Sequence, residues 1–113
     1  MKVLVVHRQE AILESITKQL AKWYVKPFNN GLDGLLAART ETFDLILCGR
    51  DLPMITCIEL VRSVRNFSMN QRTPVILLAD GTETKEHTRI YSLLDANLLT
   101  MEEVEEMENL KFE

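Results

Sequence analysis

The stretch FDLILCGRDLPMITCIEL, residues 43–60, combines a strand, a loop and the start of a helix. Its segment LILC, residues 45–48, is short and continuously apolar, which is typical of a central strand covered on both faces. Pro53 removes a backbone donor and restricts the residue before it, so no strand continues there. The intervening loop, residues 49–51, is where parallel sheets usually carry functional side chains.

A helix is predicted after this loop, over residues 57–66. Thr56 and Glu59 have the spacing of a capping box, in which the threonine side chain and the glutamate side chain each satisfy a free backbone donor. Ile58, Val61 and Val64 follow at helical spacing and predict the buried face.

The same alternation of strand and helix runs through the rest of the chain. Further strands are predicted at Lys2–Val6, Tyr24–Phe28, residues 74–78 and Ala96–Leu99. Pro27 favours an edge position for the second of them. Further helices are predicted over residues 9–23, after Asn30-Gly31, after Thr82 or Thr84, and after Thr100, which forms a second capping-box pattern with Glu103.

Apolar residues at helical spacing predict which helix faces pack inward. They are Ile12, Leu13, Ile16 and Leu20 in the first helix, Leu32, Leu35 and Leu36 in the second, Ile90, Leu93 and Leu94 in the fourth, and Met101, Val104, Met107 and Leu110 in the last. Five strands alternating with five helices predict an α/β fold, a doubly wound parallel sheet with helices on both faces.

Composition favours a single folded domain over residues 1–113, without an attached output domain. The chain is 46% hydrophobic and 27% charged, which argues against disorder. Its formal net charge of −4 argues against nucleic-acid binding. Cys48 and Cys57 are expected to be reduced thiols, and no apolar segment predicts a membrane span, so we expect a cytoplasmic protein.

The order of these features resembles response-regulator receiver domains. Asp44-Leu45 enters the apolar strand, Leu52-Pro53 follows it, and Glu59-Leu60 lies in the next helix, as in the phosphoacceptor region of that family. The resemblance extends to the first strand, to the Asn30-Gly31 turn and to the fourth strand. It covers nearly the whole chain and implies a flavodoxin-like sheet of strand order 2-1-3-4-5.

The resemblance also locates a pocket whose functional residues have been replaced. Carried over one position at a time, the acidic pair falls on His7 and Arg8, the acceptor aspartate on Gly49, the hydroxyl residue on Ala79 and the lysine on Met101. Arg50 is expected to line the same crevice. The resemblance therefore implies a degenerate receiver, or pseudo-receiver, with no catalytic residue, metal site or cofactor.

Arg8 alone reverses the electrostatics of the metal position. A unit charge about 4 Å from a monovalent ion interacts by roughly 4 kcal/mol at an effective dielectric of about 20, and by about twice that with a divalent ion. Mg²⁺ prefers oxygen ligands, so its usual binding is expected to fail. Without an acceptor carboxylate there is also no nucleophile for an acyl phosphate.

Three other roles remain open for pocket residues. Asp51 is either an unconventional phosphoacceptor or an ordinary loop carboxylate. His7 either binds a metal or phosphoryl group or simply fills the vacated acidic site. Arg8 and Arg50 either form a site for a small anion or nucleotide or pair with Asp51, Asp80 or a glutamate. No glycine-rich sequence follows Val6, which argues against a phosphate loop.

A protein partner is the remaining expectation. Receivers usually meet partners through their fourth helix, fifth strand and fifth helix. The resemblance therefore implies a partner surface, with a basic protein or a second copy as the occupant; it comprises Tyr91, Leu98, Glu102, Glu105 and Glu106. The expected function is phosphorylation-independent protein interaction in two-component-type signalling, with no enzymatic activity.

Overall fold

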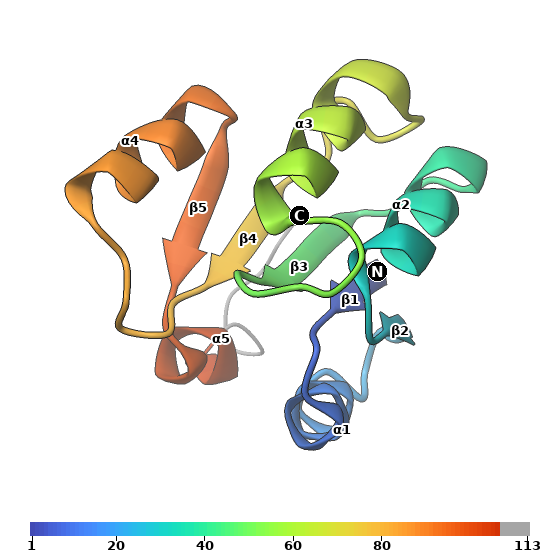
Figure 1. Ribbon diagram of the computed structural model, residues 1–113. Coiled ribbons are helices and arrows are strands. Elements are labelled where there is room, and N and C mark those ends of the chain that lie inside the picture. Colours follow the sequence, from blue (N-terminus) through green and yellow to red (C-terminus); the bar gives the residue numbers. More distant parts are fainter. Residues whose placement is uncertain (107–113) are drawn as a thin grey trace.

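The computed structural model describes residues 1–106, with the side chain of Phe67 excepted. Strands and helices alternate along this part of the chain (Figure 1). Their bounds are β1 (Lys2–Val6), α1 (Glu10–Gln19), β2 (Tyr24–Phe28), α2 (Gly31–Thr40), β3 (Leu45–Gly49), α3 (Cys57–Phe67), β4 (Val75–Leu78), α4 (Lys85–Leu93), β5 (Ala96–Leu99) and α5 (Met101–Glu106).

The strands form one parallel sheet of order β2-β1-β3-β4-β5, which confirms the predicted α/β fold. Helices α2, α3 and α4 cover one face, and α1 and α5 cover the other (Figure 1). The order reverses direction between β1 and β3, so the carboxyl ends of these two strands border a crevice. No helix of residues 1–106 is long and apolar enough to cross a membrane.

The central strands are buried on both sides, as the run at residues 45–48 predicted. All five residues of β3 are buried, and residues 3–6 of β1 are fully buried. Alternate side chains of each strand enter opposite cores, so Leu4 and Val6 pack under α2 and α3 while Val3 and Val5 pack under α1.

Side-chain caps fix the starts of four helices, and at α2 the Asn30 side chain accepts from the Asp33 N–H. The Thr56 hydroxyl accepts from the Glu59 N–H, and Thr100 and Glu103 exchange both bonds of a capping box. Thr84, and not Thr82, caps α4. Its partner is His87, whose ring nitrogen accepts from the Thr84 N–H at 3.2 Å.

The first helix ends earlier than predicted, at Gln19 instead of residue 23. Tyr24 pairs with Lys2 at the very start of β1, so the chain must turn before it. Hydrogen bonds from Ala21 to the Lys18 carbonyl and from Trp23 to the Leu20 carbonyl form that turn.

The inward face of α4 also differs from the prediction. Leu93 is 77% exposed, whereas Tyr91 is only 2% exposed and belongs to the core. Of the other predicted residues, Ile90 is half-buried and Leu94 packs against the core, and His87 is half-buried on the same side as Tyr91. Tyr91 is therefore wrong as a member of the predicted partner surface.

The inward stripe predicted for the last helix is described only in part. Val104 is fully buried, and Met101 packs against the same core cluster. Met107 and Leu110 lie outside the described residues.

Candidate functional site

The crevice at the carboxyl ends of β1 and β3 is a hollow of about 260 Å³. Five of the six predicted pocket residues line it, namely His7, Arg8, Arg50, Ala79 and Met101. The sixth, Gly49, ends β3 beneath the His7 ring. Position along the strands thus placed the crevice residues, although it could not give their side-chain directions.

His7 occupies the space in which a side chain at position 49 would lie. A Cβ atom added to Gly49 would come within 2.6 Å of His7 Cδ2 and 3.1 Å of His7 Nε2. Real Cβ atoms do not approach carbon so closely, so the ring and a side chain at position 49 exclude each other. The acceptor position is closed sterically as well as lacking a carboxylate.

The His7 ring is held in a neutral form. Its Nδ1 atom accepts from the Gln9 N–H at 3.0 Å, which leaves the proton of a neutral ring on Nε2. Burial lowers the pKa of His7, and the neighbouring Arg8 lowers it further. A neutral imidazole packed on glycine fills the vacated acidic site.

Arg8 forms an ion pair with Asp51 at the mouth of the crevice. Both side chains are exposed, at 53% and 74%, so solvent screens the pair. The pair gives Asp51 a structural partner and crosses from the β1–α1 loop to the β3–α3 loop.

Arg50 turns away from Arg8 toward α4, and its side chain is only 9% exposed. Its Nε donates to the Tyr91 hydroxyl at 2.7 Å, and its Nη2 lies 2.9 Å from His87 Nδ1. Its Nη1 donates to Asp80 and to the Thr82 hydroxyl, at 2.7 and 2.6 Å. We call this group, Arg50 with Asp80, Thr82, His87 and Tyr91, the Arg50 network.

The Arg50 network stabilises its own charges. Burial works to lower the pKa of Arg50, but contacts with Tyr91 and Asp80 outweigh burial and raise it. The Thr82 hydroxyl donates to Asp80 at 2.6 Å and, with Arg50, holds the pKa of Asp80 at about 2 against the opposing effect of burial. Burial raises the pKa of Tyr91, so its hydroxyl remains protonated.

Arg8 and Arg50, the two arginines proposed as an anion site, bind different partners instead of facing each other. Every nitrogen of the Arg50 guanidinium has a partner in the network, and Arg8 has Asp51. The alternative stated with that prediction, pairing with Asp51 and Asp80, describes the geometry.

The receiver family implies Mg²⁺ at this crevice, and the residues present do not fit it. The positions beside β1 carry an imidazole and a guanidinium, and the carboxylates of Asp51 and Asp80 are each paired with an arginine. Within residues 1–106, no group of three histidine, cysteine or acidic side chains is placed to hold a metal.

Sequence reasoning missed the Arg50 network. Its sequence signals are the Asp80-Gly81-Thr82 turn, in which the Thr82 N–H donates to the Asp80 carboxylate at 2.9 Å, and His87 three residues after Thr84.

The two cysteines are buried and free, as expected, and burial raises the pKa of both thiols.

The remaining residues of the predicted partner surface differ in their exposure. Glu102, Glu105 and Glu106 of α5 are exposed, and Leu98 of β5 is half-buried. The Glu105 carbonyl accepts from Gln19 of α1 at 3.0 Å, which ties α5 to α1.

Solved receiver structures match the chain closely in fold. The chemotaxis response regulator CheY4 of Vibrio cholerae superposes with a TM-score of 0.83 at 25% identity, over 96% of this chain and 94% of that one. The beryllofluoride-activated receiver domain of DrrB, a Thermotoga maritima protein, gives 0.76 at 26% identity, over 88% and 82%. The receiver domain of the Francisella response regulator 1452 gives 0.81 at 23% identity, over 96% and 93%.

No profile of a known protein family and no characterised protein matches the chain by sequence. The assignment therefore rests on the fold, its strand order and the solved receivers at 25% identity or more. On these grounds the chain has the fold of the CheY-like response-regulator receiver domains, and its solved structural neighbours are receiver domains of that family.

Proposed function

We propose that this chain is a pseudo-receiver, a signalling module that acts through protein–protein interaction and without phosphorylation. One observation carries the proposal: the His7 ring lies where the side chain of an acceptor at position 49 would stand. A phosphoryl group has neither a carboxylate to join nor space at that position. The module is not an enzyme on this proposal, and it acts in the cytoplasm.

The Arg50 network supports a single, fixed arrangement of α4. Arg50 lies just after β3, Asp80 and Thr82 lie in the β4–α4 loop, and Tyr91 lies in α4 itself. The Arg50 side chain therefore links the loop after β3, which follows the acceptor position of receivers, to α4, which borders the proposed partner surface. The link consists of residues already in the chain and needs no added phosphoryl group.

The proposed partner surface is acidic. Glu102, Glu105 and Glu106 project from α5, and Leu98 adds an apolar contact. Charge complementarity favours a protein partner with a basic surface, or a basic face of a second copy.

A phosphorylation assay tests the closed pocket. The chain is incubated with Mg²⁺ and acetyl phosphate, or with Mg²⁺ and beryllofluoride, and followed by intact mass and amide chemical shifts. We expect an unchanged mass and no shifts at residues 7–8 and 49–51. An added phosphoryl group in the wild type that is absent from Asp51→Asn would instead establish Asp51 as an acceptor and overturn the proposal.

A stability cycle tests the steric part separately. Gly49→Ala is expected to cost about 1–3 kcal/mol of unfolding free energy, because the new methyl group overlaps the His7 ring. In the His7→Ala background the same change is expected to cost less than about 1 kcal/mol. Equal costs in both backgrounds would remove the steric argument.

A capture experiment tests the partner surface. Proteins captured from the native host by the wild type are expected to be lost with the charge reversal Glu102→Lys plus Glu106→Lys. Glu59→Lys, a reversal at an exposed position on α3, serves as the control. Equal loss with both variants would contradict a defined surface on α5.

A further inference from the structure

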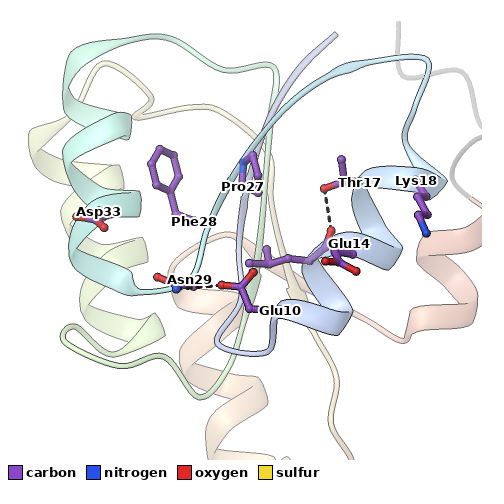
Figure 2. Close-up of a pocket in the computed structure, with 9 residues that line it drawn as sticks. Glu10, Glu14, Thr17, Lys18, Pro27, Phe28, Asn29 and Asp33 are labelled. Carbon is purple, nitrogen blue, oxygen red and sulfur yellow. Dashed lines mark hydrogen bonds between the residues drawn. The ribbon is translucent and has the colours of Figure 1, made fainter.

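A larger hollow, of about 510 Å³, lies beside the edge strand β2, away from the Arg50 network. Its walls come from α1 on one side and from the end of β2 with Asp33 of α2 on the other (Figure 2). Figure 2 shows Glu10 and Asn29 facing each other across one end, where the Asn29 amide donates to the Glu10 carboxylate at 3.1 Å. The receiver chemistry described above uses none of these residues.

The floor of this hollow is apolar. Leu13, Pro27 and Phe28 line it, and Leu13 is 4% exposed while Phe28 is half-buried. A second hollow of about 320 Å³ shares Phe28 and Asp33 with it and continues to Leu36 of α2, which is 50% exposed. The two hollows therefore adjoin at Phe28 and Asp33, and we call them together the β2 groove.

The edge strand itself is poorly suited to pairing with another strand. Pro27, its fourth residue, has no N–H to donate, and the Lys26 ammonium is paired with Glu41 beside it. An occupant of the β2 groove is therefore bound through side chains and not by extension of the sheet.

The rim of the larger hollow carries unbalanced negative charge. Three carboxylates, Glu10, Glu14 and Asp33, line it against one ammonium, Lys18. Among the residues that the structure describes, Glu10 and Asp33 accept only from the side-chain amides of Asn29 and Asn30, which bring no positive charge. Within residues 1–106, Glu14 and Lys18 are joined to each other by no ion pair, although they lie four residues apart on α1.

We propose that the β2 groove binds a basic, amphipathic segment of a protein partner. An apolar side chain of that segment lies over Leu13 and Phe28, and its lysine or arginine side chains face Glu10, Glu14 and Asp33. The same charges repel nucleic-acid phosphates and anionic lipid headgroups. This surface is separate from the α5 glutamates, so the two proposals stand or fall independently.

A peptide titration tests this proposal on the full chain. The probe is a capped ten-residue peptide of alternating lysine and leucine pairs, titrated while amide chemical shifts are recorded. We expect saturable shifts confined to residues 10–18 and 27–36. A matched peptide with glutamate in place of lysine should cause none, and one with serine in place of leucine should bind at least about fivefold more weakly.

Charge-reversal variants distinguish the groove from general attraction to an acidic protein. Glu14→Lys should weaken binding of the lysine–leucine peptide about fivefold, because an exposed carboxylate at the rim becomes an ammonium. Glu86→Lys makes the same change in net charge at an exposed position on α4 and should leave the affinity within about twofold. Equal weakening by the two variants, or shifts centred on α5, would overturn the proposal.

Discussion

Helix α4 is held at each end by an arginine from the segment after β3, and the two arginines use different acceptors. At the carboxyl end, Arg65 of α3 donates to backbone carbonyl groups only, those of Gln71, Thr73, Leu94 and Asp95. At the amino end and along the inward face, Arg50 contacts side chains: it hydrogen-bonds to those of Tyr91, Asp80, Thr82 and His87 and forms an ion pair with Glu83 at 3.7 Å. The same residue type thus serves as two kinds of anchor.

The difference lies in what each anchor depends on. Backbone carbonyl groups do not titrate, so the Arg65 contacts are the same at every pH at which the chain is folded. The Arg50 contacts include the Asp80 carboxylate, which can gain a proton. Arg65 therefore holds the carboxyl end of α4 through backbone carbonyl groups, which every residue has. Arg50 holds the amino end through side chains, which solution conditions and substitutions can change.

Removal of the Arg65 anchor should have the largest effect. Arg65→Ala leaves four carbonyl acceptors without their donor, two of them at 2.7 and 2.8 Å, and should lower the unfolding free energy by about 3 kcal/mol. Urea denaturation measures the loss. Arg62→Ala, an exposed position on the same helix, should cost less than about 0.5 kcal/mol. A loss below about 1 kcal/mol for Arg65→Ala would mean that the carbonyl anchor is dispensable.

Removal of the Arg50 anchor should have a smaller and more local effect. Arg50→Gln should cost about 2 kcal/mol, because the Tyr91 hydroxyl loses its donor and Asp80 its ion pair, although Asp80 remains 44% exposed to water. Hydrogen exchange should accelerate in residues 85–91, while residues 94–96 stay protected by Arg65. Arg8→Gln, which breaks an exposed pair, should cost about 0–1 kcal/mol. Uniform acceleration along α4 would show that its two ends are not held separately.

A single hydroxyl should account for about half of the Arg50 effect. Tyr91→Phe keeps the buried ring but removes the acceptor of the Arg50 Nε–H, so it should cost about 1 kcal/mol. In the Arg50→Gln background the same substitution should cost less, because the bond is already absent. Equal costs in the two backgrounds would place the role of the hydroxyl elsewhere, for example at the neighbouring Cys57 thiol.

The sequence predicted most of what depends on local patterns. The apolar run at residues 45–48 and the edge position of Pro27 determined the sheet, and the spacing of Thr100 and Glu103 predicted a cap that forms in full. The strand ends also placed His7 and Gly49 in one crevice. These features follow from periodicity and from connectivity, both of which are explicit in the sequence.

Side-chain direction was not predictable in the same way. Helix α4 buries Tyr91, which packs in the core and accepts from Arg50, and it turns Leu93 outward. Arg50 itself lies in a loop, where neither the helical nor the strand periodicity predicts the direction of a side chain. Its choice between the crevice and α4 depends on Asp80, Tyr91 and the fold of both loops together.

Acid should weaken one anchor and spare the other, and this effect should be the smallest. The folded-state pKa of Asp80 is about 2, below its ordinary value of 3.8, so its contribution to stability is complete above pH 4 and is lost as the pH falls toward 2. Because the Asp80 side chain is 44% exposed, solvent screening limits that contribution to about 1 kcal/mol. The stability difference between the wild type and Asp80→Asn should therefore shrink by about half between pH 6 and pH 3. The stability difference between the wild type and Arg65→Ala should stay constant over the same range, because carbonyl acceptors do not titrate. Parallel changes in both stability differences would show that the two anchors share one electrostatic origin.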